Sequence, residues 1–442
     1  MLSADKKKWT VLSVATLLTA LFTACSSGAP AAVNQAGTPT VVPSLTANAI
    51  STSAQTNTPT SSGLTSTPQL SILVWWPAAL YPDEKSAAVR TLHEQLNAYT
   101  ASTSQVVTVR VKRNEGLGSI YQTLLSGSVV AQSDMPDLAL LRRSDLALAV
   151  AAKLVEQIDT KALSTTDFYP AGLALGQING NQYGIPYVLE VQQIIYRTTA
   201  LPTPPHTLDE LVVSGQNILF PAGVLKGVNT TLLQQYLAMG GHITDSKGAP
   251  TLDIDPLRNV LHYYEQAVVA KVVSPQLLDY VNLSQYWQTF LNGKANLVQV
   301  DSTTYLAQRA NLTNVGTIPI LLPASSTPIS AIDGWLWVVT TPDPDRQARA
   351  LSLLSWFIRS DQQGAFTQAM GVLPSQRSAL MAWGDDKYAA FAGTLLEQPA
   401  VPPQDVIDPQ VASALQDAFV GVLSGRKTAD LAANDAQASV AK

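Results

Sequence analysis

The residues with catalytic potential are spread along the chain and match no known catalytic pattern. Its four histidines form no HExxH zinc motif, and the chain has no G-x-S-x-G nucleophile motif. Residues 116–121, GLGSIY, lack the third glycine and the later acidic residue of a dinucleotide-binding loop. The acidic stretches LDIDP and PDPDR lack the central glycine and final glutamate of a calcium loop. The sequence therefore predicts no metal, no cofactor and no enzymatic activity, although a glycosidase pair of carboxylates needs no motif and stays open.

Aromatic and charged side chains follow three predicted strands. Three apolar or β-branched runs between residues 70 and 141 predict strands, and helical spacing between the runs predicts helices. Strands that alternate with helices indicate a parallel, doubly wound sheet, which binds ligands beyond the carboxyl ends of its strands. Because neighbouring strand residues face opposite ways, we expect Trp75 in the core and Trp76 towards a ligand. The side chains at the strand ends that we expect in a cleft are Trp76, Glu115 and Arg143.

The single cysteine, Cys25, follows a stretch laid out like a secretory signal. The stretch begins with three lysines, continues with an apolar run at 10–22 that is too short to span a bilayer, and ends in two small residues. This order resembles a bacterial lipoprotein signal, although Phe22 stands where that motif usually has leucine. The resemblance implies that residues 1–24 are removed and that Cys25 becomes the lipidated first residue. The alternative is a buried cysteine after an uncleaved helix.

Residues 25–69 are expected to form a flexible linker behind the lipidated cysteine. After Cys25 the segment is rich in Ser, Thr, Ala and Pro and contains no Asp, Glu, Lys or Arg. It has too few large apolar residues to offset the entropy lost on ordering. We therefore expect it to hold the folded part away from a membrane surface.

Composition restricts the function of the chain beyond residue 69. Apolar residues make up 46% of the sequence and charged residues only 13%. The formal net charge is −5, and loss of Asp5 and three lysines with the signal would leave −7. This excludes a basic field for nucleic acid, and no later stretch predicts a membrane span. About 370 residues are enough for two lobes, and a mainly neutral polar surface suits a neutral, hydroxyl-bearing ligand.

Five segments resemble, in order, the extracellular solute-binding proteins that supply ABC importers, in the group that includes carbohydrate binders. The most telling is GNQYGIPYVLEVQQIIYRTTALPTPPHTLDEL at 180–211. It contains a Tyr-Gly-Ile-Pro turn, a glutamate, a strand ending in tyrosine, and a Thr-x-x-Glu capping box. The other segments are 287–306, 331–358, 371–380 and 423–436. The resemblance spans about residues 70 to 442.

The resemblance implies an α/β fold of two lobes, each a doubly wound sheet with flanking helices, with the ligand cleft at the hinge. On that template the first lobe takes residues 70–187 and 314–358. The second lobe takes residues 188–313 and 359–442. The lobes would close on the ligand, expel water and strengthen its hydrogen bonds.

The resemblance also implies positions for ligand contacts. Trp335 would be a stacking plate for a sugar ring, whereas Trp337, deeper in the strand, would be core. Glu190 would be a hydrogen-bonding carboxylate just past the hinge turn. Asp301 ends a predicted strand, but Ser302 and the next residues stand where related sugar binders often have tryptophan. Cleft candidates of lower rank are Tyr81, Tyr187 and Tyr236.

These observations indicate an extracytoplasmic lipoprotein that captures a small solute, foremost a sugar or oligosaccharide, and delivers it to the permease subunits of an ABC importer. We expect a monomer anchored by its lipid to the bacterial membrane, on the periplasmic side where an outer membrane exists. A receptor for a polyamine, phosphodiester or peptide is the alternative within this class. A secreted carbohydrate-active enzyme or adhesion lipoprotein is the alternative outside it.

Overall fold

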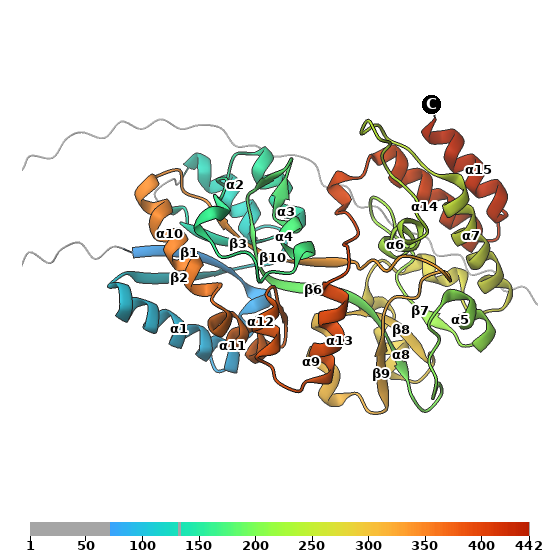
Figure 1. The fold of residues 1–442 in the computed structure, drawn as a ribbon, viewed down its shortest axis with the longest axis horizontal. Helices are drawn as coiled ribbons and strands as arrows, with labels where there is room; N and C mark the ends of the chain where they lie inside the picture. Colours follow the sequence, from blue (N-terminus) through green and yellow to red (C-terminus); the bar gives the residue numbers. More distant parts are fainter. Residues whose placement is uncertain (1–70, 131–133, 442) are drawn as a thin grey trace, which may run out of the picture. The chain divides into compact units, whose positions relative to one another are not determined.

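A computed structural model describes residues 71–130 and 134–441. The predicted signal, Cys25 and the linker lie outside the described residues. Strands and helices alternate along most of the described chain, as expected (Figure 1). Within the described ranges, no helix is both long and apolar enough to cross a membrane.

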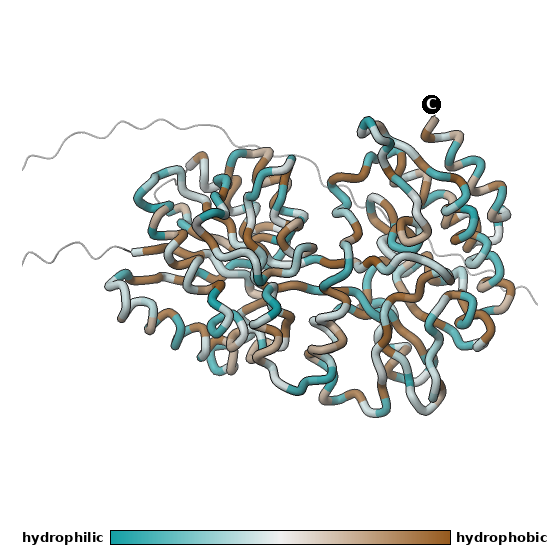
Figure 2. Tube along the Cα trace, viewed as in Figure 1, coloured by the Kyte–Doolittle hydropathy of each residue, from teal (hydrophilic) through white to brown (hydrophobic). Residues whose placement is uncertain are grey.

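A nine-stranded mixed sheet forms the framework, in the order β2-β1-β3-β10-β6-β8-β7, with β9 and β11 also paired to β6. The three strands predicted near the start are present and parallel. Strand β10 runs antiparallel beside β3, and β6 runs antiparallel beside β10. The hydrophobic colouring follows these strands in Figure 2. The strands are β1 (Ser71–Pro77), β2 (Val106–Lys112), β3 (Leu138–Arg142), β6 (Ile185–Arg197), β7 (Ile218–Leu219), β8 (Leu297–Asp301), β9 (Val315–Ile318), β10 (Ile332–Val339) and β11 (Leu373–Pro374); β4 (Gln177–Ile178) and β5 (Asn181–Gln182) pair separately.

Two apolar cores cover the two faces of the strands β1, β3 and β10. Side chains of α1, α10 and α11 build the first core, and side chains of α2, α3, α4, α12 and α13 build the second. Because helices cover both faces, both Trp75 and Trp76 are buried. The helices are α1 (Ala87–Thr103), α2 (Ile120–Val130), α3 (Arg143–Ala151), α4 (Pro170–Leu175), α10 (Pro344–Phe357), α11 (Ser360–Met370), α12 (Arg377–Met381) and α13 (Lys387–Leu396). We call these elements the first lobe.

A third core gathers the remaining elements around the far half of β6, and we call them the second lobe. Its helix α5 starts at the predicted cap, where the Thr207 hydroxyl accepts from the Glu210 amide at 3.2 Å. The Glu210 carboxylate accepts from the His206 amide instead of the Thr207 amide. The helices are α5 (Leu208–Ser214), α6 (Thr230–Ala238), α7 (Ile254–Val269), α8 (Trp287–Leu291), α14 (Pro409–Leu423) and α15 (Ala429–Val440), while α9 (Ser302–Gln308) lies against β6.

The packing differs from the lobe boundaries expected from the sequence. Helices α11 to α13, within the stretch 359–442 assigned to the second lobe, pack into the cores of the first. Conversely, Ile318, Ile320 and Leu321, assigned to the first lobe, pack into the core of the second. The physical reason is that Phe366 and Leu380 bury their apolar side chains in the two cores of the first lobe, beside the other helices that cover its strands.

Three of the stretches in which the described chain passes between the cores lie side by side. The first passage is within β6, the second lies between Ala331 and Ile332, and the third lies between Leu396 and Val401. The Gln192 amide donates to the Ala331 carbonyl at 3.0 Å. The Val401 amide donates to the Ser330 carbonyl at 2.8 Å, so all three passages are joined by backbone hydrogen bonds.

Candidate functional site

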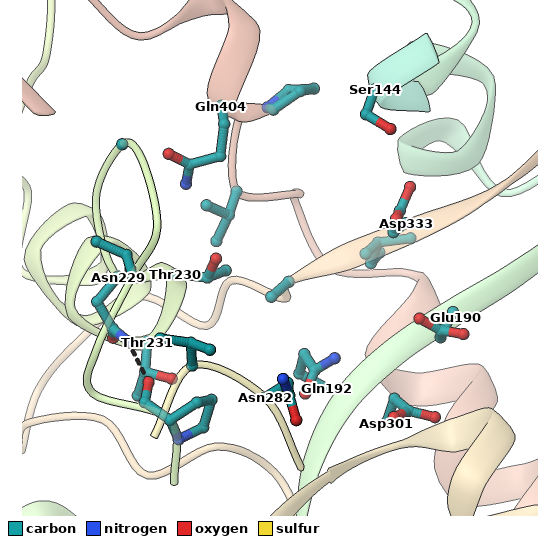
Figure 3. A pocket seen from close by; sticks show the side chains of 18 of the residues that line it. Ser144, Glu190, Gln192, Asn229, Thr230, Thr231, Asn282, Asp301, Asp333 and Gln404 are labelled. Carbon is teal, nitrogen blue, oxygen red and sulfur yellow. Dashed lines mark hydrogen bonds between the residues drawn. The ribbon is translucent and has the colours of Figure 1, made fainter. Parts of the chain in front are cut away.

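A cavity of about 710 Å³ is lined by residues of both lobes next to the three passages. The first lobe contributes the start of α3, and the second contributes the start of α6 and the loop before the short helix η5 (Leu283–Gln285). The polar lining residues labelled in Figure 3 are Ser144, Glu190, Gln192, Asn229, Thr230, Thr231, Asn282, Asp301, Asp333 and Gln404. A volume of this size falls in the range of small-molecule sites.

The sheet supplies one polar strip along the cavity. Glu190 on β6 stands opposite Asp333 on β10, and Gln192 stands opposite Asp301 on β8. Opposite residues of antiparallel strands share a face, and so do residues two apart on one strand. The strip therefore brings three carboxylates and an amide together from three strands, as Figure 3 shows.

Arg142 is the cation closest to this strip. Its Nη2 lies 3.5 Å from the Glu190 carboxylate and 3.7 Å from the Asp333 carboxylate. Burial lowers the pKa of Arg142, but Asp333 and Glu190 outweigh it and raise the pKa above its ordinary value. Burial raises the pKa of Glu190, Arg142 opposes that rise, and the nearby Asp301 adds to it. Negative charge therefore exceeds positive charge along the strip.

A second cavity of about 540 Å³ shares Ser144, Glu190 and Asp333 with the first. Its lining also includes Glu115 and Trp335. The Trp335 side chain lies mostly in the protein, since the residue is only 8% exposed. The Arg142 guanidinium sits 5.2 Å from the centre of the indole ring. Trp335 therefore contacts the Arg142 guanidinium through its ring and also lines the cavity.

Five of the eight predicted ligand contacts lie at these two cavities. Arg143, Glu190 and Asp301 line the larger one. Glu115 and Trp335 line the smaller one, which Glu190 also reaches. Segments far apart in the sequence are thus brought together at these cavities.

Trp76 belongs to the core and not to a cleft, which corrects the expectation from the sequence. It is fully buried, and its indole N–H donates to the Leu80 carbonyl at 3.0 Å. Its ring packs edge-on against Trp337 at 5.5 Å and against Phe366 at 5.3 Å. The alternation rule placed it opposite Trp75 correctly but could not tell that α11 covers that face.

The tyrosine candidates also lie away from the cavities. Tyr236 is fully buried, and burial raises its pKa to about 12. Its hydroxyl donates to the His242 carbonyl at 2.6 Å and accepts from the Asp253 amide at 2.8 Å. Tyr187 is fully buried in the first core, as Trp337 is. Tyr81 packs at the edge of that core and donates to Glu84 at 2.9 Å.

Several lining residues were not singled out in the sequence. Gln192 follows Glu190 by two residues, so strand alternation places both on one face and was a usable signal. Asn229 caps α6 through a bond from the Leu232 amide at 2.9 Å. Gln299 accepts from the Thr231 hydroxyl at 2.8 Å, a pairing between distant segments that no local pattern indicates.

The described residues contain no group of three or more His, Cys, Asp or Glu side chains arranged to hold a metal ion. The carboxylates of the strip are instead separated by Arg142 and by hydroxyl partners. The Thr303 hydroxyl, for example, donates to Glu190 at 3.0 Å. The chemistry available in the larger cavity is hydrogen bonding to a solute by carboxylates, amides and hydroxyls.

Comparison with known proteins adds a family match. The model of the family described as bacterial extracellular solute-binding protein matches residues 94–392 of this chain. Among curated proteins, a sequence search found no match. The matched stretch covers most of both lobes and four of the strands that line the cavities.

Solved structures with a similar fold align with most of the chain. The cyclic α-maltosyl-1,6-maltose binding protein from Arthrobacter globiformis has a TM-score of 0.67 at 18% identity, covering 84% of this chain and 98% of that protein. The sugar-binding protein MalE from Xanthomonas citri has a TM-score of 0.66 at 16% identity, with 84% and 96% covered. Maltose-bound MalE3 from T. maritima has a TM-score of 0.61 at 16% identity, with 84% and 99% covered. These similarities confirm the predicted two-lobed α/β fold.

Proposed function

Because the chain belongs to the bacterial extracellular solute-binding proteins, we propose that it captures a small solute between its lobes and delivers it to the permease of an ABC importer. The observation that carries this proposal is the cavity of about 710 Å³, lined from both lobes by hydrogen-bonding side chains. A solute that contacts both lobes binds the conformation that encloses it better than an open one, and so shifts the population towards it.

A neutral sugar or oligosaccharide is the solute that the lining supports best. Amides and carboxylates such as Gln192, Asn282 and Asp301 supply hydrogen bonds for hydroxyl groups. The similar structures named above are described as binding maltose-type sugars or as sugar-binding. Among the described residues that line the larger cavity, Tyr286 is the one aromatic, and it is itself buried, which favours recognition mainly by hydrogen bonds there.

The charge of the residues that line the cavities ranks the alternative solutes. Six acidic residues line the two cavities against three basic ones, Arg142, Arg143 and Lys226. This excess disfavours an anionic solute such as a phosphodiester, since like charges repel in a partly buried site. It leaves a polyamine as the second candidate. The acidic residues are Glu115, Asp145, Glu190, Asp301, Asp333 and Asp405.

A thermal-shift screen tests the function and the order of candidates. The protein would be heated with maltose, maltotetraose, ribitol, putrescine and a phosphodiester, because a bound solute raises the melting temperature. A rise with the sugars and none with the phosphodiester is expected. Recovery of maltotetraose intact after long incubation supports binding without turnover, whereas shorter products would support an enzyme.

Replacing Trp335 with alanine is expected to weaken solute binding by about 1–3 kcal/mol, the range for losing a buried aromatic contact. The substitution also removes the ring that the Arg142 guanidinium contacts. Titration calorimetry with the solute from the screen measures the effect. The matched control is Trp356→Ala, because that ring also lies under a guanidinium, Arg359 at 4.9 Å, but lines neither cavity. Equal affinities in wild type and Trp335→Ala would remove Trp335 from the site.

We also propose that Cys25 carries a lipid that anchors the protein outside the cell. The basic, apolar and small residues before it support this proposal. Cys25→Ser is expected to release the protein from the membrane fraction, because the acyl chains have no other attachment point in the chain. Fractionation and immunoblotting measure this. A mutant that stays with the membranes would contradict the lipid anchor.

A further inference from the structure

Asp405 occupies an unusual position between the lobes. It lies in the short helix η7 (Gln404–Val406), just past the third passage of the chain. Its carboxylate accepts from Arg143 Nη2 at 2.9 Å, and Arg143 is the first residue of α3 in the first lobe. Both residues line the larger cavity. The ion pair therefore bridges the two lobes at the site where a solute would bind.

The neighbouring residue ties η7 to the second lobe. Gln404 donates to the Val228 carbonyl at 3.1 Å and accepts from the Val228 amide at 3.1 Å. Val228 is buried in the core of the second lobe. In turn, the Asn229 amide donates to Gln416 of α14 at 2.9 Å. Asp405 therefore has to move with the second lobe, while Arg143 moves with the first.

The Arg143 end of the pair is fixed in a different way. Its side chain is only 5% exposed, whereas that of Asp405 is 30% exposed. Two of its nitrogens, Nε and Nη1, are buried without a hydrogen-bond partner among the described residues. A buried guanidinium needs a counter-charge, and Asp405 is the carboxylate that supplies it here. Loss of Asp405 would leave this buried charge unpaired.

We propose that Asp405 is a positioning residue of the cleft. It holds Arg143 of the first lobe against the second lobe and thereby favours the conformation in which both lobes line the cavity. The proposal rests on the proposed function, because it describes how the solute site is assembled. The lobes can bend relative to each other at the three hydrogen-bonded passages, and the Arg143–Asp405 ion pair lies beyond these passages. Separation of the lobes has to break this pair.

The distance between the lobes tests this proposal without any solute. Dyes attached to Val129→Cys in α2 and Val269→Cys in α7, both about 80% exposed, report the distance by single-molecule energy transfer. The full chain carries Cys25→Ser, so that only these two cysteines react. With Asp405→Asn, the population in the wild-type distance is expected to fall roughly tenfold relative to separated states, a change of about 1.4 kcal/mol. Asp405→Glu is expected to restore most of it.

Control variants separate positioning from general damage. Asp385→Asn makes the same chemical change at an exposed site and is expected to leave the distance distribution unchanged. In a double-mutant cycle, Arg143→Gln combined with Asp405→Asn should add little to either single change, because both remove one interaction. An unchanged distribution in Asp405→Asn, or additive effects in the cycle, would overturn the proposal.

The affinity for a solute gives a second readout. Asp405→Asn is expected to weaken binding of the sugar identified in the screen by a similar factor, mainly through faster dissociation, because a smaller fraction of the protein is in the binding conformation. If no solute in the screen binds, the proposed function fails while the energy-transfer result still decides the role of Asp405. Altered distances with unchanged affinity would restrict the pair to lobe geometry and contradict its role in the site.

Discussion

Replacing Trp76 with alanine is expected to lower the free energy of unfolding by about 3–5 kcal/mol, the range for removing a large aromatic side chain from a packed core. Trp76 is fully buried among Tyr187, Trp337, Phe357 and Phe366, with ring centres 5.3–6.1 Å apart. The cavity left behind would forfeit all of these contacts. Urea unfolding followed by circular dichroism measures the loss.

The Trp76→Ala variant also tests whether Trp76 belongs to the core or to the cleft. The protein that remains folded should bind its solute with unchanged affinity, because Trp76 lines neither cavity. Trp76→Phe keeps most of the buried area and serves as the milder variant if the alanine protein does not fold. A variant of normal stability that no longer binds solute would place Trp76 in the cleft after all.

Replacing Glu190 with glutamine is expected to weaken solute binding by about 1.5–3 kcal/mol, the range for a hydrogen bond to a charged group. Glu190 lies at the junction of both cavities, opposite Asp333 and within 3.5 Å of Arg142. The substitution keeps the shape of the side chain but removes the charge. Titration calorimetry measures the change, with the exposed Glu84→Gln as the matched control.

The pH dependence of binding gives an independent check on Glu190. Burial raises the pKa of Glu190, so on acidification it takes up a proton at a higher pH than an exposed glutamate does. Binding that needs its carboxylate should therefore weaken as the pH falls through this raised pKa and be fully present above it. In Glu190→Gln that part of the pH dependence should disappear. An identical pH profile in both proteins would exclude Glu190 as a charged contact.

Local patterns in the sequence predicted the strands and part of the site. The runs that became β1 and β3 are apolar because helices cover both faces of the sheet there. Strand β2 lies at the edge of the sheet, and its residues are half-buried or exposed. Glu190 and Asp301 came from a resemblance to a family, and the structure places both at the larger cavity. What alternation could not supply was the depth of each side chain, which is why Trp76 was expected in the cleft.

The remaining features depend on contacts between distant segments. Helices α11 to α13 follow the second passage, and no local pattern in their sequence indicates which core they complete. Arg143 and Asp405 are separated by 262 positions in the chain. Arg143 was expected in a cleft because it follows a predicted strand, but no local pattern pairs it with Asp405. Only the packing of α3 against η7 brings the two together.

The order in which the chain visits its lobes has a consequence for biosynthesis. The second lobe is begun after the first passage but is completed only by α14 and α15, the last two helices, which pack against α7. Until they emerge, the apolar stripe of α7, which includes Leu257, Val260 and Leu261, is covered only in part, by α5 and α6. The second lobe can therefore complete its core only after α14 and α15 have been synthesised, long after its first strand.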